Sequence, residues 1–175
     1  LRTASRKSHI MQVIGIMERG IMLIFIPLLT LSADVLDKFV SAEQKFRKVC
    51  VFHLDELVDN APEQYNAFLW TCDGLPHDTA NTVFAFLSPH HLIRYPRSLR
   101  TLLNASDNGS LRSIVMDEVH LHVQHGTLFC DECCALTTQF FKPVFHPLGR
   151  TSTVRFLATL ATVPALYIPN IARLT

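Results

Sequence analysis

The chain has 175 residues, of which 49% are hydrophobic and 18% are charged, and its formal net charge is +1. This length suits one domain with a substantial core. The 12 phenylalanines exclude a disordered chain, which is poor in aromatic residues and rich in charge. The net charge shows no broad basic footprint, so a nucleic-acid function has to be argued from motifs.

The predicted elements alternate between helices and short, apolar strands. In chain order they are a helix over residues 8–18, a strand over 21–26, a helix over 32–48, a strand over 49–53, a helix over 54–69, and strands over 82–87, 113–116 and 153–157. Turn-forming residues predict loops over 73–81 and 104–110. The strands lack a period of two, which is typical of strands buried on both faces. Residues 1–175 are therefore expected to form a single α/β domain with a mostly parallel sheet.

The most apolar run covers residues 21–31, about half the length of a membrane-spanning helix, and it contains Pro27. We therefore expect no membrane segment. A cleaved signal peptide is the competing interpretation, because basic residues precede the run. Against it, residues 9–18 already carry an apolar helical pattern, and Glu18 lies shortly before the run. Five cysteines, an odd count, favour a reducing compartment, so the expected location is nuclear or cytoplasmic rather than secreted.

An acidic pair follows the strand predicted over residues 113–116, where the chain reads Asp117-Glu118-Val119-His120. Ligands of parallel sheets bind beyond the carboxyl ends of the strands. A carboxylate at that position can hold Mg²⁺ through water, while its neighbour orients a hydrolytic water. The competing interpretation is an exposed turn at the end of a strand, where Asp and Glu are common.

The same region offers an alternative function as a structural zinc module. Six potential zinc ligands occur within fifteen positions, namely His120, His122, His125, Cys130, Cys133 and Cys134. The first two cysteines of this set have zinc-ligand spacing, but no second pair with finger spacing accompanies them.

The acidic motif and the loop after it resemble the first RecA-like domain of the superfamily-two helicases, specifically the RecQ type. That family carries Asp-Glu-x-His followed by an aromatic-rich loop, and Gln124, Gly126 and Phe129 fall in register with the loop. Four loop positions depart from the family, with His125, Thr127, Leu128 and Cys130 in place of Trp, His, Asp and Arg. The resemblance implies a three-layer P-loop NTPase (RecA-like) fold, truncated at its N-terminus and lacking the second RecA-like domain.

Two further segments resemble DNA-contacting motifs of this family. Pro27 and Leu28 match a segment at a strand end that touches the DNA backbone, and Ser88 matches a Thr-Pro-Glu motif at a later strand end. Arg94 and Arg97 follow, with Arg100 continuing the three-residue spacing. These arginines either face phosphates or form a solvated basic face.

Near the C-terminus the chain resembles the family's Ser/Thr-Ala-Thr motif, which links the nucleotide site to the nucleic-acid site through hydroxyl groups. Two registers fit the motif, one ending on Thr159 and the other on Thr162.

The first residues align with the family's phosphate-binding loop, Thr-Gly-x-Gly-Lys-Ser. The resemblance implies that the nucleotide-binding residues are Thr3, Ser5, Arg6, Lys7 and Ser8. Lys7 would reach the β- and γ-phosphates, and the Ser8 hydroxyl would reach Mg²⁺. Ala4 and Arg6 replace the two glycines, so a positive φ at either position would cost about 1–2 kcal/mol.

The resemblance implies a domain of an ATP-dependent DNA helicase that uses ATP and Mg²⁺ and binds DNA at a junction of single and double strands. Asp117 and Ser8 would hold Mg²⁺ through the nucleotide, and Glu118 would activate the attacking water. His120, Gln124, Phe129 and the threonine near the C-terminus would relay nucleotide state to DNA.

The family's transition-state arginine comes from the second RecA-like domain. We therefore expect this chain alone neither to unwind DNA nor to hydrolyse ATP appreciably. A decayed helicase-like domain that folds without hydrolysing ATP is the alternative.

Overall fold

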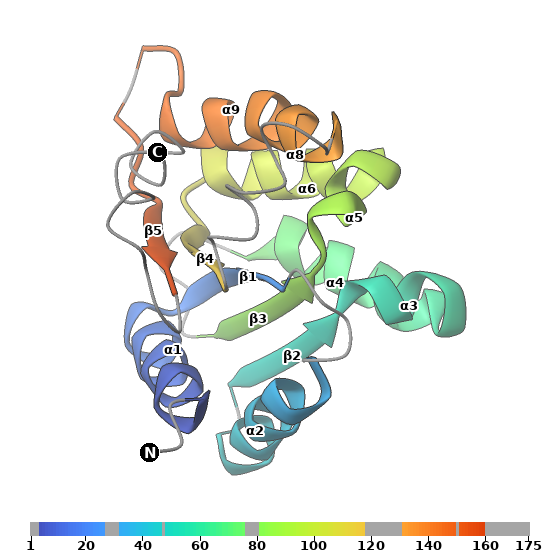
Figure 1. Ribbon diagram of the computed structural model, residues 1–175, viewed down its shortest axis with the longest axis vertical. Helices are drawn as coiled ribbons and strands as arrows, with labels where there is room; N and C mark the ends of the chain where they lie inside the picture. Colours follow the sequence, from blue (N-terminus) through green and yellow to red (C-terminus); the bar gives the residue numbers. More distant parts are fainter. Residues whose placement is uncertain are drawn as a thin grey trace.

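A five-stranded, all-parallel β-sheet forms the centre of the protein in the computed structural model (Figure 1). The structure describes residues 4–26, 32–46, 48–75, 81–117, 131–149 and 151–159. The strands are β1 (Gly20–Phe25), β2 (Val49–His53), β3 (Thr82–Leu87), β4 (Leu111–Met116) and β5 (Arg155–Ala158). Their order across the sheet is β2-β3-β1-β4-β5. The predicted α/β architecture with a parallel sheet is therefore confirmed.

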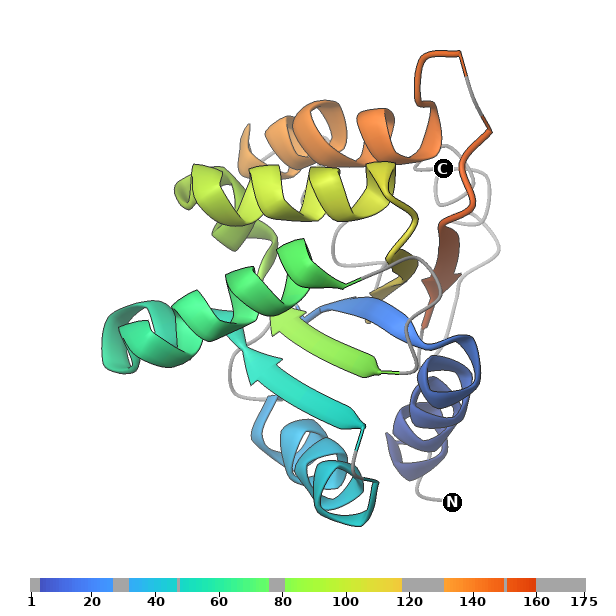
Figure 2. The same ribbon diagram turned by 180° about the vertical axis from the view of Figure 1, so that it is seen from behind.

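Helices cover both faces of the sheet and make a three-layer molecule (Figures 1 and 2). One face carries α1 (Ala4–Glu18) and α2 (Ser32–Lys45). The other face carries α4 (Pro62–Gly74), α6 (Pro96–Asp107) and a continuous helical segment made of α8 (Asp131–Leu136), η2 (Thr137–Phe141) and α9 (Lys142–Phe145). Two short helices, α3 (Leu54–Asn60) and α5 (Pro89–Arg94), follow the carboxyl ends of β2 and β3.

Strand β1 shows why the sheet has a core on each side. Because side chains alternate along a strand, Ile21 and Leu23 join the core under α4 and α6, whereas Met22 and Ile24 join the core under α1 and α2. All six residues of β1 are buried, and the same is true of β3. The expectation that the strands are buried on both faces holds for these two central strands.

Phenylalanine rings of the helices pack against phenylalanine rings of the sheet on both faces. Phe39 of α2 lies edge-on to Phe84 and Phe86 of β3, with ring centroids 4.8 and 4.9 Å apart. On the opposite face, Phe25 of β1 lies edge-on to Phe141 of η2 at 5.6 Å. Edge-to-face pairs of this kind add about 0.5–1.5 kcal/mol each to the burial of the rings.

The predicted helix over 32–48 is too long, because α2 ends at Lys45. Lys48, directly before β2, instead accepts a hydrogen bond on its carbonyl oxygen from Thr82 N of β3 at 2.7 Å. The predicted helix over 54–69 is two helices, α3 and α4, which meet at Ala61. Pro62 disfavours the α conformation in the residue before it, and Ala61 has φ −147°.

The predicted loop over 104–110 is wrong in its first half, because α6 continues to Asp107. Ala105 packs into the core and holds this last turn, and Gly109 then turns the chain with φ 75°. The loop predicted over 73–81 starts two residues too early, because α4 continues to Gly74. The last two strands are also shifted, with β4 starting at Leu111 and β5 covering Arg155–Ala158.

Helices α5, α6 and the α8–α9 segment were not predicted from the sequence. Within the described residues, no helix is long and apolar enough to cross a membrane.

Candidate functional site

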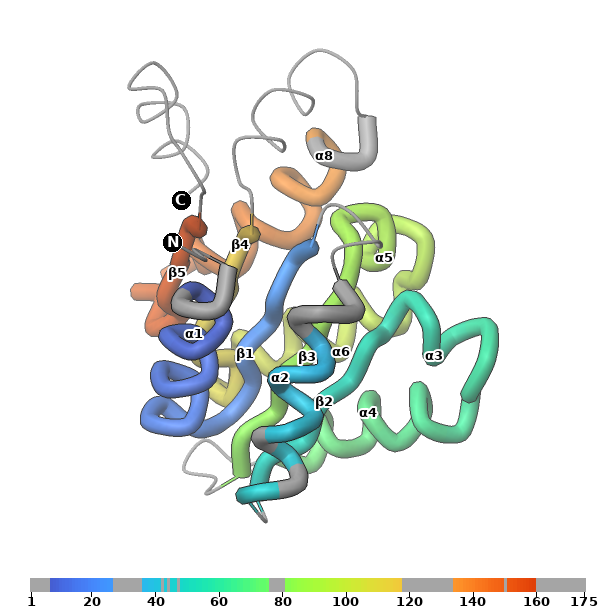
Figure 3. Tube along the Cα trace, turned by 60° about the horizontal axis from the view of Figure 1, so that its bottom comes forward, coloured from blue at the N-terminus to red at the C-terminus, as the bar shows by residue number. Residues whose placement is uncertain are grey.

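The carboxyl ends of β4 and β5 bring together three residues from distant parts of the chain. Asp117 directly follows β4, and its N–H donates to Phe25 O at 3.0 Å. Thr159 directly follows β5, and its N–H donates to Met116 O at 3.0 Å. Helix α1 starts near this edge and runs alongside the strands toward the opposite edge, which places Lys7 close to the strand ends (Figure 3).

Asp117 is the centre of this group, which we call the Lys7–Asp117–Thr159 cluster. Asp117 Oδ1 lies 3.7 Å from Lys7 Nζ and accepts a hydrogen bond from Thr159 Oγ1 at 2.5 Å. The side chains of Lys7 and Asp117 are 21% and 19% exposed, so the cluster is partly sheltered but open to solvent. Ser8, next along α1, is buried. Of the two registers for the Ser/Thr-Ala-Thr motif, the one that ends on Thr159 contacts Asp117.

The other residues expected around this site are only partly described. Thr3, Pro27, Leu28, Glu118, His120, Gln124, Phe129 and Thr162 lie outside the described residues. For Ser5 and Arg6 the structure describes the backbone alone, which lies in α1.

The expected phosphate loop has a different backbone from the one the alignment implies. Helix α1 already begins at Ala4, so Ala4 and Arg6 have helical dihedral angles and the strain of a positive φ does not arise. The first N–H groups of a helix have no partner within it and attract anions. Anion binding at this place would therefore depend on the helix N-terminus and Lys7 rather than on a glycine-rich loop.

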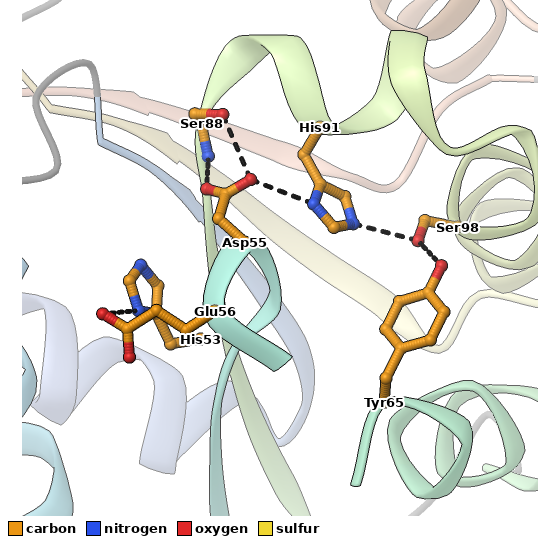
Figure 4. A network of polar contacts seen from close by, with 7 residues as sticks. All are labelled: His53, Asp55, Glu56, Tyr65, Ser88, His91 and Ser98. Carbon is orange, nitrogen blue, oxygen red and sulfur yellow. Dashed lines mark hydrogen bonds and ion pairs between the residues drawn. The ribbon is translucent and has the colours of Figure 1, made fainter. Parts of the chain in front are cut away.

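A second polar group lies where β2 and β3 end, and it was not predicted (Figure 4). Asp55, in the first turn of α3, accepts a hydrogen bond from Ser88 N at 2.5 Å on Oδ2. Its Oδ1 accepts one from Ser88 Oγ at 3.2 Å and lies 3.0 Å from His91 Nδ1. His91 Nε2 lies 3.1 Å from Ser98 Oγ, which lies 2.6 Å from the hydroxyl of Tyr65. We call this the Asp55–His91 network.

One arrangement of protons satisfies every group in the Asp55–His91 network. The His91 Nδ1–H donates to Asp55, the Ser98 hydroxyl donates to His91 Nε2, and the Tyr65 hydroxyl donates to Ser98 Oγ. Burial alone would raise the pKa of Asp55, but the hydrogen bonds from His91 and Ser88 outweigh it and hold the pKa below its ordinary value.

The Asp–His–Ser order of this network resembles that of a hydrolytic triad, but Ser98 has no exposed surface and His91 is only 1% exposed. A nucleophile must reach its substrate, so the network is structural: it ties α3, α4, α5 and α6 together. It also occupies the Ser88 hydroxyl, which the resemblance had assigned to nucleic acid.

The three arginines that follow Ser88 are all exposed. The Arg94 guanidinium carbon lies 5.7 Å from the centroid of the Tyr95 ring, and Arg97 Nη1 donates to Asn66 Oδ1 of α4 at 3.0 Å. These local contacts leave most of each guanidinium surface in solvent, which is compatible with both interpretations of the basic spacing.

The zinc hypothesis rests almost entirely on residues whose side chains are not described. Cys134, the described member of that set, is exposed. No group of three potential ligands that could hold a metal occurs among the residues that the structure describes.

Comparison with protein-family models gives no match for this chain, and comparison with curated proteins gives none either.

Proposed function

We propose that this chain is the nucleotide-binding domain of a RecQ-like, ATP-dependent DNA helicase, acting on DNA in the nucleus or cytoplasm. The observation that carries the proposal is the Lys7–Asp117–Thr159 cluster. Each of its residues was selected from a different motif of the resemblance, and the ion pair and hydrogen bond that join them span 110 and 42 residues of sequence. The proposed function requires these three residues to lie together, and their contacts at the carboxyl edge of the sheet support it.

The chemistry of the cluster fits a magnesium-bound triphosphate. Mg²⁺ prefers oxygen ligands and keeps several waters, which suits a partly exposed carboxylate such as Asp117. Lys7 supplies a positive charge 3.7 Å from that carboxylate, beside the N-terminus of α1, where a phosphate would gain from both. When bound, MgATP supplies the free energy of hydrolysis that drives unwinding.

Thr159 gives the site a connection to the rest of the domain. Its hydroxyl donates to Asp117, and its main-chain N–H donates to the last residue of β4. A change in the charge around Asp117 would therefore alter the hydrogen bond from Thr159 at the end of β5. In the proposed function this contact passes the state of the nucleotide site toward bound DNA.

A second candidate function is a helicase-like domain that folds but does not hydrolyse ATP. The start of α1 at Ala4 favours it, because residues 4–6 are wound into the helix and their N–H groups do not form a loop around a phosphate. Because the chain alone is not expected to hydrolyse ATP in either case, binding of MgATP separates the first candidate from a relic that has also lost its nucleotide site.

Titration of the folded chain with MgATP tests the proposal. We expect saturable binding that weakens about tenfold or more in Lys7→Ala, because a charge-assisted hydrogen bond contributes about 1.5–3 kcal/mol. Lys45→Ala, an exposed lysine at the end of α2, is the matched control and should bind as the wild type does. Absence of binding by a chain with a native circular-dichroism spectrum would reject the nucleotide site and favour the second candidate.

A further inference from the structure

Helices α4 and α6 form an exposed surface that combines an aromatic ring with arginines. Both helices return the chain from the carboxyl edge of the sheet to the other edge, so they run side by side in the same direction (Figure 2). The hydrogen bond from Arg97, in the first turn of α6, to Asn66, in the second turn of α4, joins the two helices. One turn further along, α4 presents Trp70 and α6 presents Arg100.

Trp70 is the single tryptophan of the chain and is 73% exposed. It lies four residues after Asn66, and long helical side chains lean back over the preceding turn. Trp70 therefore shares a face of α4 with Asn66, which accepts the hydrogen bond from Arg97. Its neighbours on the buried side of α4, Phe68 and Leu69, are fully buried, so the helix that carries the ring is firmly anchored.

The first half of α6 carries positive charge, and the one acidic residue of this helix, Asp107, stands at its last position. The sequence from Ser88 to Ser106 contains three arginines and no acidic residue, and Arg97 and Arg100 are exposed. Planar guanidinium groups match phosphates in a bidentate manner. An exposed aromatic ring beside them offers a stacking platform for a base, which is how proteins bind single strands without reading their sequence.

We propose that Trp70, Arg97 and Arg100 form a subsite for single-stranded nucleic acid, in which a base stacks on Trp70 and the flanking phosphates pair with the two arginines. This inference rests on the proposed function and adds a contact for the strand on the α4–α6 surface. The subsite is short, because exposed acidic residues, Glu63 and Asp73, lie one turn beyond it at either end of α4.

The sole tryptophan makes the test direct. The intrinsic fluorescence of the full chain is recorded while a short oligothymidylate of about 12 nucleotides is added without ATP. We expect saturable quenching. Trp70→Ala should weaken binding, measured by fluorescence anisotropy of a labelled strand, by about 5- to 100-fold, whereas Trp70→Phe should keep most of the affinity.

Charge variants test the arginines. Arg97→Gln should lower the slope of log affinity against log salt by about 0.7, and Asp73→Asn, its counterpart of opposite charge, should strengthen binding. Because Trp70 is exposed, its variants should keep the wild-type circular-dichroism spectrum.

Three outcomes would overturn the inference. If DNA binds with wild-type affinity to Trp70→Ala and leaves the fluorescence unchanged, the subsite is wrong while the proposed function stands. If no DNA binds to the wild-type chain, the inference fails together with the DNA-binding part of the proposed function. If polyglutamate quenches Trp70 as strongly as the oligonucleotide does, the surface binds acidic protein segments instead.

Discussion

Removal of the Asp55 carboxylate should destabilise the protein more than any other single change on the surface of α3. In Asp55→Ala, the buried His91 loses the acceptor for its Nδ1–H, and Ser88 N–H loses its partner at the start of α5. A hydrogen bond to a charged group contributes about 1.5–3 kcal/mol, and an unsatisfied buried donor costs about 1–3 kcal/mol. Because water can reach the half-buried Ser88, we expect a loss of about 2–4 kcal/mol rather than the full sum.

Urea denaturation followed by circular dichroism measures this loss. Asp59→Ala, an exposed carboxylate on the same helix, is the matched control and should change the free energy of unfolding by less than about 0.5 kcal/mol. The sign of the pH dependence follows from the pKa of Asp55, which is lower in the folded protein than its ordinary value. The stabilisation is present above about pH 4 and is lost as the pH falls through the folded pKa.

The difference between wild type and Asp55→Ala should therefore shrink in acid. Two results would refute the reasoning: a loss below about 1 kcal/mol at neutral pH, or a difference that stays constant as the pH is lowered below the ordinary aspartate pKa.

Three further predictions concern packing and chemistry. Gly20→Ala and Gly149→Ala both place a side chain at a positive φ, 81° and 76°, but only at Gly20 would the new Cβ meet a main-chain oxygen, at 2.6 Å. In urea denaturation, Gly149→Ala should lower the free energy of unfolding by about 1–2 kcal/mol, and Gly20→Ala should lower it clearly more. Phe39→Ala should cost about 3–5 kcal/mol in the same assay, since the ring is fully buried against β3, and a loss below 2 kcal/mol would contradict the role of this ring in the core. Burial raises the pKa of the Cys72 thiol, so mass spectrometry after alkylation of the folded chain should find the exposed Cys134 modified and Cys72 unmodified until urea is added.

The strands could be predicted from the sequence because a buried strand has a local signature. Residues 49–53 and 82–87 are short apolar runs bounded by polar residues, and β2 and β3 have the predicted bounds. The helices over 89–107 were not predicted, since two prolines, Pro89 and Pro96, stand in this stretch and proline is unfavourable inside a helix. Both prolines instead stand in the first turn of a helix, where the missing N–H has no partner to lose.

The candidate site was predicted in part for a similar reason. Each residue of the Lys7–Asp117–Thr159 cluster belongs to a short sequence motif that resembles one of the helicase family. Their meeting depends on the order of the strands, since β4 and β5 are neighbours and α1 packs beside β1 and β3. The winding of residues 4–6 into α1 is likewise a property of the folded chain, and it changes what the phosphate-binding alignment can mean.

The sequence by itself thus determined the α/β class and the buried strands, and it singled out Lys7 and Asp117 as candidates, because each of these depends on residues close together in the chain. The structure chose Thr159 over Thr162 as the partner of Asp117. Only the tertiary structure decided the Asp55–His91 network and the α4–α6 surface. Asp55 follows β2 and Ser88 follows β3, and they meet because these strands are neighbours in a parallel sheet, although 33 residues separate them in sequence. Trp70 and Arg97 share a surface because the helices that carry them must both run antiparallel to the strands they connect. Such contacts have no local signature, since they are made by the topology of the sheet.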